Sequence, residues 1–153
     1  IRGKALSNAL IEFLSIINWG NQDLLVIDMP PGIGDVFLDI VRYIQWARHL
    51  IVTTSSILSI STVRRLIRFL MDQEYEIVGI IENMKIPTLD HVEVLTREID
   101  IRYLGSIPYD AELEDAYGDP KKLIGTKMAK ALEVIADRII QEELTGYKPG
   151  QPF

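Results

Sequence analysis

The chain has 153 residues, of which 48% are hydrophobic and 25% charged, so it can bury a sizeable core. Its formal net charge of −6 argues against a nucleic-acid-binding surface, because such surfaces are basic. It contains no cysteine, which excludes disulfides, thiolate zinc sites and iron–sulfur ligation by cysteines of this chain, and no apolar run reaches the roughly 18 residues of a membrane span.

The first third of the chain predicts a helix, a strand and a second helix. Apolar residues recur with a helical period over residues 4–17. The continuous apolar run at residues 24–27 ends in Asp28 and is typical of a strand buried on both faces of a parallel sheet. Two prolines and a glycine, residues 30–32, end that strand, and a helix is predicted over residues 35–46.

Strand and helix patterns alternate through the rest of the chain. Further strands are predicted at residues 50–53, 77–81 and 101–105, and further helices at residues 61–71, 89–99, 111–117 and 123–144. Four strands separated by helices predict an α/β fold, a three-layer sandwich with a mainly parallel sheet. Residues 1–145 show no linker and are predicted to form one domain, followed by a flexible tail at residues 146–153.

The segment after the first predicted strand is the first candidate site, because ligands of such sheets bind beyond the carboxyl ends of the strands. An acidic residue at the end of a buried apolar strand is the Walker B arrangement, in which the Asp28 carboxylate would hold Mg²⁺. Gly32 is the first residue after two prolines with a free N–H, and no side chain blocks approach to a phosphate there. The alternative is a plain strand-to-helix turn, but the run of eight residues favours phosphate binding.

Two more candidates follow later strands. Asn83 follows the strand at residues 77–81, and its amide offers the donor and acceptor that match the edge of adenine, although a turn or helix cap is an equal alternative. Pro108 and Asp110 follow the last strand, where a backbone and a carboxylate could face the exocyclic amine of a base; alone, they favour a plain turn. All these motifs fall on one edge of the predicted sheet, which favours a shared nucleotide site.

These motifs together resemble a known family. The resemblance covers nearly the whole chain, at residues 2–3, 19–20, 28–35, 53–54, 79–84 and 107–110. The double proline followed by Gly-x-Gly-Asp resembles the Mrp/ApbC family, SIMIBI-class P-loop ATPases related to MinD, ParA and the nitrogenase iron protein. The resemblance implies that this chain is the C-terminal part of such a domain. Asp28 would then be the magnesium-associated Walker B aspartate and Gly32 the switch II contact to the γ-phosphate, with the adenine pocket lined by Asn83, Pro108 and Asp110.

The same resemblance implies ATP and Mg²⁺ as cofactors, homodimers in the cytoplasm, and a role in assembling or carrying iron–sulfur clusters. Nothing in the chain matches the family's Gly-rich lysine loop, which we expect upstream of Ile1, and no residue here is assigned a catalytic role. We therefore expect ATP hydrolysis by the intact protein and not by this chain alone. The family's paired cysteines are absent, so this chain would ligate no cluster, and Ser55 stands where the family usually has proline.

Two alternatives remain open. One is a non-catalytic dimerisation or interaction module derived from the same fold. The other is a ParA/MinD-type positioning ATPase, which the double proline and the lack of a basic amphipathic tail helix disfavour. Without the phosphate-loop strand the sheet would be incomplete and would expose an edge and an apolar face. We therefore expect a homo-oligomer, or association with the missing N-terminal half, and neither nucleic-acid nor membrane partners.

Overall fold

The computed structural model describes residues 2–144, and the predicted tail at residues 146–153 lies outside them. The chain divides into two compact units, residues 1–47 and residues 48–153. None of the helices described is long and apolar enough to cross a membrane.

The first unit contains two helices, α1 (Arg2–Ile16) and α2 (Asp35–Tyr43), which contact each other and lie close to the predicted ranges. α2 buries Phe37, Ile40 and Val41, which share one face at helical spacing. Asp35 lies in the first turn of α2, where its negative charge interacts favourably with the helix dipole.

The predicted strand at residues 24–27 is not formed. The segment belongs to none of the β-ladders among residues 2–144, and Leu24, Leu25 and Val26 are 59%, 50% and 81% exposed. A strand exists only where its backbone N–H and C=O groups pair with a neighbour, and an apolar composition does not supply that neighbour. The run therefore leaves an exposed apolar stretch in front of Asp28.

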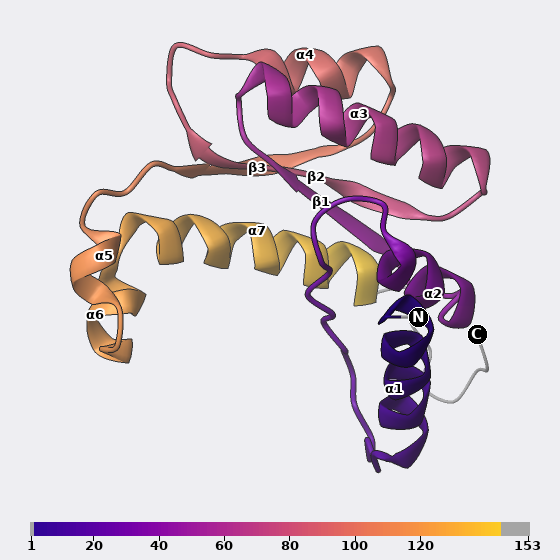
Figure 1. Cartoon of the computed structure of the whole chain (residues 1–153). Helices are drawn as coiled ribbons and strands as arrows, with labels where there is room; N and C mark the ends of the chain where they lie inside the picture. The colour runs from indigo at the N-terminus through magenta and orange to yellow at the C-terminus, as the bar shows by residue number, and fades with distance from the viewer. Residues whose placement is uncertain (1, 145–153) are drawn as a thin grey trace. The chain divides into compact units, whose positions relative to one another are not determined.

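The second unit is built on a three-stranded parallel sheet in the order β1 (His49–Thr53), β2 (Ile77–Lys85), β3 (Tyr103–Pro108). Its helices are α3 (Ile57–Asp72), α4 (His91–Glu98), α5 (Leu113–Ala116), α6 (Pro120–Gly125) and α7 (Lys127–Leu144). Helices α3 and α4 lie on one face of the sheet and α7 on the other (Figure 1). The predicted three-layer α/β sandwich with a parallel sheet is confirmed in this unit.

The side chains of β2 and β3 are more completely buried than those of the edge strand β1. Central strand β2 and strand β3 pack against α7 through an apolar cluster of Ile81, Leu104, Ile107 and Ile135. Strand β1 forms one edge of the described sheet and alternates, with Ile51 buried while Leu50 and Val52 are 44% and 55% exposed. Strand β1 therefore presents two exposed apolar side chains, Leu50 and Val52, on one face.

The predicted helix at residues 123–144 is two helices, because Thr126 ends α6 and begins α7. The Thr126 hydroxyl donates to the Leu123 carbonyl at 2.7 Å and accepts from the Ala129 N–H at 3.1 Å. A threonine at this position satisfies a backbone donor in the first turn of the following helix, and Gly125 before it favours the end of the preceding one. The Gly-Thr pair was the sequence signal for this break.

Candidate functional site

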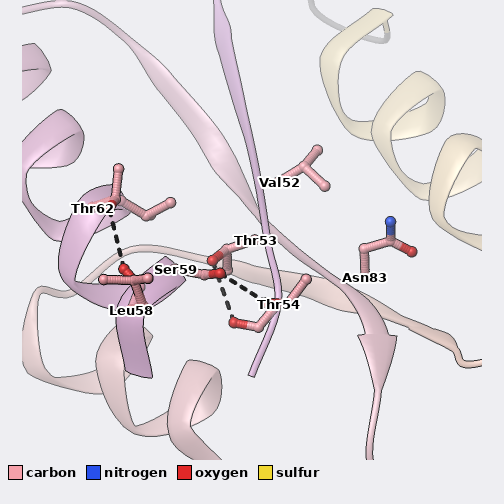
Figure 2. Close-up of a pocket in the computed structure, with 8 residues that line it drawn as sticks. Val52, Thr53, Thr54, Leu58, Ser59, Thr62 and Asn83 are labelled. Atoms are coloured by element: carbon pink, nitrogen blue, oxygen red, sulfur yellow. Dashed lines mark hydrogen bonds between the residues drawn. The ribbon is translucent and has the colours of Figure 1, made fainter. Parts of the chain in front are cut away.

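Asn83 lies near the carboxyl end of β2, where the end of β1 and the start of α3 form an open hollow of about 410 Å³ (Figure 2). The hollow is lined by Val52, Thr53 and Thr54 from the β1 end, by Leu58, Ser59, Thr62 and Val63 from α3, and by Asn83. Val52 pairs in register with Ile81, so Val52 and Asn83 extend from the same face of the sheet, as Figure 2 shows. The hollow combines hydroxyls and an amide with apolar walls.

The orientation of the Asn83 amide is fixed by its neighbour. The Met84 N–H donates to Asn83 Oδ1 at 2.9 Å, and only the oxygen of an amide side chain can accept that bond. The Asn83 NH₂ group is therefore the end that remains available as a donor. Met84 itself has φ +52°, a left-handed conformation that is strained for a non-glycine residue.

Pro108 is the last residue of β3, the strand next to β2, and Asp110 follows two residues later, so all three candidates of this unit lie along the carboxyl edge of the sheet. Pro108 is exposed. The Asp110 carboxylate accepts from the N–H groups of Lys127 and Met128, at 2.9 and 3.3 Å, and from the N–H of Glu112 at 3.2 Å. Asp110 thus binds the N-terminus of α7, a structural role that the sequence did not indicate.

Asp28 and Gly32 lie in the first unit, in the segment between the apolar run and α2. Asp28 is exposed, and residues 2–144 contain no cluster of three or more His, Cys, Asp or Glu side chains that could hold a metal. A lone exposed carboxylate fits Mg²⁺, because this ion keeps several waters and commonly takes one or two protein carboxylates. Gly32 has φ +81°, and a Cβ added to it would have no atom within 4 Å, so its backbone is open to an approaching phosphate.

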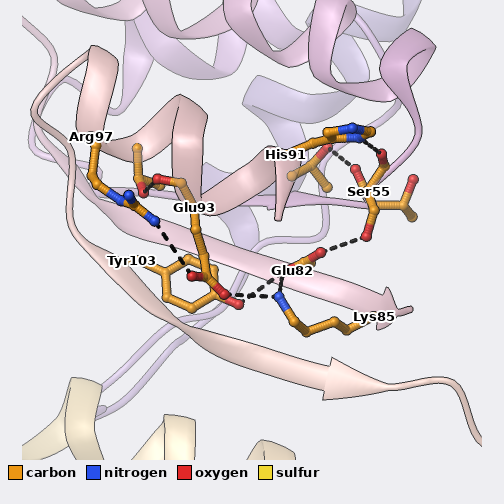
Figure 3. Close-up of polar contacts among 10 residues, drawn as sticks. Ser55, Glu82, Lys85, His91, Glu93, Arg97 and Tyr103 are labelled. Carbon is orange, nitrogen blue, oxygen red and sulfur yellow. Dashed lines mark hydrogen bonds and ion pairs between the residues drawn. The ribbon is translucent and has the colours of Figure 1, made fainter. Parts of the chain in front are cut away.

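A buried polar network surrounds Glu82 (Figure 3). Because side chains alternate along a strand, Glu82 extends from the face of the sheet opposite to Asn83. The Glu82 side chain is fully buried, and its carboxylate accepts from Ser55 Oγ at 2.5 Å, Lys85 Nζ at 2.7 Å and Tyr103 OH at 2.9 Å. Lys85 also bonds Glu93 of α4 at 2.9 Å. This network was not predicted from the sequence, although a glutamate directly after the apolar residues 77–81 indicates a charge that needs partners.

The network also ties the loop after β1 to its neighbours. The Ser55 hydroxyl donates to Glu82, and the Ser55 carbonyl lies 2.9 Å from Nδ1 of His91, the first residue of α4. The loop that borders the hollow is therefore held from both β2 and α4.

The network shifts the pKa values of its members. Burial alone would raise the pKa of the Glu82 carboxyl, but hydrogen bonds from Lys85, Ser55 and Tyr103 and the Lys85 charge hold it below its ordinary value. Burial would lower the pKa of Lys85, yet its bonds to Glu82 and Glu93 raise it. Burial and the neighbouring Glu82 carboxylate raise the pKa of the Tyr103 phenol.

These shifts predict a stability plateau between mild acid and mild base. The Glu82 contribution is present above its unfolded pKa of about 4.3 and is lost as the pH falls through the lower folded value. The Lys85 and Tyr103 contributions are present below their unfolded pKa values, near 10, and are lost as the pH rises through the raised folded values. Urea unfolding at stepped pH measures this, and Glu82→Gln should flatten the acid limb; an unchanged acid slope in that variant would contradict the assignment.

Comparison with known proteins identifies the family. Residues 1–142 match the family model described as ParA: NUBPL iron-transfer P-loop NTPase. The chain belongs to this P-loop NTPase family. The resemblance to Mrp-type members of the MinD and ParA superfamily is thereby confirmed.

Relatives of this P-loop NTPase chain include two with names that refer to iron–sulfur clusters. It is 32% identical over 161 residues to the cytosolic Fe-S cluster assembly factor Nubp1 homolog of Drosophila melanogaster. This match covers 91% of this chain and 52% of that protein. It is 29% identical over 156 residues to an iron-sulfur cluster carrier protein of Pyrococcus abyssi, covering 92% and 53% respectively. The chain thus spans about half the length of these relatives.

A solved structure supports the fold of the P-loop NTPase chain. The MinD cell division protein of Aquifex aeolicus superposes with a TM-score of 0.68 at 24% sequence identity, covering 96% of this chain and 62% of that one. At this identity the likeness shows the α/β fold alone.

Proposed function

We propose that this chain is part of an ATP-binding, ATP-hydrolysing protein of the Mrp type that assembles or carries iron–sulfur clusters. The observation that carries the proposal is the match of residues 1–142 to an iron-transfer P-loop NTPase family. The names of the Drosophila and Pyrococcus relatives support the link to iron–sulfur clusters, and the word cytosolic in the former supports a cytoplasmic location.

The proposal assigns the nucleotide contacts to backbone and side-chain groups at two places. Asp28 would hold Mg²⁺, which neutralises phosphate charge when bound, and the N–H of Gly32 would donate to the γ-phosphate. Asn83, Pro108 and Asp110 would line the adenine pocket. The free NH₂ group of Asn83 supports this role, because it can donate to a ring nitrogen of the base.

The iron–sulfur cluster enters this proposal as cargo. The 153 residues contain no cysteine, so thiolate ligands for a cluster would come from outside this sequence. This chain would contribute the nucleotide-sensing segments, with a homodimer bringing two such sites together.

Calorimetric titration with Mg-ATP tests the proposal. We expect residues 1–153 to bind at best weakly, because their sequence holds no Gly-rich lysine loop. A form of the protein that does carry such a loop should bind in the micromolar range. In such a protein, Asp28→Asn and Gly32→Ala should each weaken binding by about tenfold or more. Failure of a loop-containing product to bind Mg-ATP would sink the proposed function.

Gly118→Ala is the matched control for Gly32→Ala. Gly118 has φ +85° against +81° for Gly32, and neither has an atom within 4 Å of an added Cβ. The two substitutions therefore introduce the same backbone strain, of about 1 kcal/mol, but only Gly32 lies in the segment proposed to contact the γ-phosphate. Equal loss of Mg-ATP affinity in both variants would show that strain, and not a phosphate contact, is responsible.

A second candidate function, an interaction module, is favoured by the exposed apolar surface. Leu24, Leu25 and Val26 in the first unit, and Leu50 and Val52 on β1 in the second, are each at least 44% exposed. Surfaces of this kind are commonly covered by a partner. We expect sedimentation velocity to show concentration-dependent association of residues 1–153, whereas a monomer at all concentrations would count against a homo-oligomer.

A further inference from the structure

Glu82 is a buried carboxylate that the proposed nucleotide contacts do not use. Its side chain is 0% exposed in the middle of the sheet, where an unpaired charge would be strongly unfavourable. Three donors satisfy it, from the β1 loop, from β3 and from Lys85 three residues along its own strand. The bond to Lys85 has a geometric consequence that the other two do not.

Between Glu82 and Lys85, strand β2 contains one residue more than the paired part of β3. Glu82 pairs with Ser106 and Lys85 with Pro108, so Asn83 and Met84 together stand opposite the single residue Ile107. This is the pattern of a β-bulge, and bulges next to functional sites redirect side chains. The left-handed conformation of Met84, φ +52°, belongs to this bulge.

The bulge changes the face on which the next side chain lies. In a regular strand, side chains two residues apart share a face, so Lys85 would lie with Asn83. Because of the extra residue, Lys85 instead returns to the face of Glu82, where it bonds Glu82 at 2.7 Å and Glu93 of α4 at 2.9 Å. The Glu82–Lys85 ion pair thus joins the two residues that flank the bulge, on either side of Asn83 and Met84 in the chain. Figure 3 shows this ion pair.

We propose that Glu82 is a positioning residue for the nucleotide site, whose ion pair with Lys85 holds the bulge that presents the Asn83 amide. In this bulge the Met84 N–H donates to Asn83 Oδ1, so the NH₂ group of Asn83 is left to donate to a base. The proposal rests on the proposed function for the identity of the ligand, but the local geometry can be tested without a ligand.

Hydrogen exchange of the Met84 amide, followed by NMR on the full chain, tests the geometry. Glu82→Gln removes the charge of the pair and should speed exchange of this amide by about tenfold and shift the side-chain NH₂ signals of Asn83. The buried Leu104 amide exchanges through global unfolding and therefore reports separately any general loss of stability. Glu93→Gln is the matched control, because it removes the other partner of Lys85 and leaves the Glu82–Lys85 pair; it should leave Met84 unchanged. Unaltered Met84 exchange in Glu82→Gln, or an equal effect of Glu93→Gln, would overturn the proposal.

Substitutions of the partly exposed partner provide the same test should Glu82→Gln fail to fold. Lys85 is 20% exposed, and Lys85→Gln should speed Met84 exchange as Glu82→Gln does. Lys85→Arg keeps the charge, so its Met84 amide should exchange as slowly as that of the unsubstituted chain. Equal exchange in these two variants would show that the ion pair does not hold the bulge.

A double-mutant cycle connects Glu82 to the ligand. In a form of the protein that binds Mg-ATP, Glu82→Gln and Asn83→Ala should each weaken binding by about tenfold, and the double variant should bind no more weakly than Asn83→Ala alone. Additive losses would mean that Glu82 does not act through Asn83. If no form binds Mg-ATP, the proposed function fails, while the Met84 exchange data still decide whether Glu82 holds the bulge.

Discussion

Gly79→Ala is expected to lower the free energy of unfolding of the second unit by about 3–5 kcal/mol. A Cβ at this position would lie 2.7 Å from Leu104 Cγ and 2.8 Å from the Arg102 carbonyl oxygen. That oxygen already accepts the Ile80 N–H at 2.9 Å, so moving it away would disturb the pairing of β2 with β3. Gly79 also has φ +156°, which L-residues rarely adopt.

Gly125→Ala is the control for Gly79→Ala. Gly125 ends α6, has no atom within 4 Å of an added Cβ and has no positive φ, so alanine should be tolerated there. Urea unfolding followed by circular dichroism measures both variants. A Gly79→Ala protein within about 1 kcal/mol of the unsubstituted chain would show that Leu104 and the Arg102 carbonyl can shift enough to admit the methyl group, and would contradict the prediction.

Glu82→Ala is expected to destabilise the second unit by about 3–5 kcal/mol. The substitution leaves the hydroxyls of Ser55 and Tyr103 without their common acceptor and removes one of the two carboxylates that bond Lys85. The loss is that of breaking a buried pair, because one partner remains in a poorly solvated position.

Glu76→Ala separates this effect from the loss of an ion pair in general. Glu76 pairs with Arg48 at 3.1 Å, but the two side chains are 60% and 46% exposed. An exposed pair contributes at most about 1 kcal/mol, so this variant should unfold close to the unsubstituted chain. Similar losses in both glutamate variants would contradict the special role of the buried site.

The sheet of the second unit could be predicted because each of its strands contains a short apolar run that is visible in the sequence. The apolar runs at residues 50–53 and 77–81 lie within β1 and β2, and the helices between them keep the strands parallel. The run at residues 24–27 has the same composition and was predicted as a strand for the same reason. It forms none, because pairing depends on a neighbour that composition does not reveal.

The candidate site was only partly predictable. The glycine and asparagine motifs were visible, since Gly32 and Asn83 follow apolar runs, but the bulge that presents Asn83 depends on Lys85 crossing to the other face. Ser55 is a second example: the sequence showed only that it replaces a usual proline, whereas the structure gives its hydroxyl a bond to Glu82 that proline could not make. Such roles arise from contacts 27 residues apart in the chain.

The open edge of β1 links the stability of this chain to its surroundings. The outer backbone groups of residues 49–53 can pair only with an extended segment from elsewhere, and that edge exists only while the sheet is folded. Any molecule that pairs with it therefore binds the native state alone, and mass action shifts the equilibrium away from unfolding. If such a molecule binds, the melting temperature would rise with its concentration and would fall again on dilution.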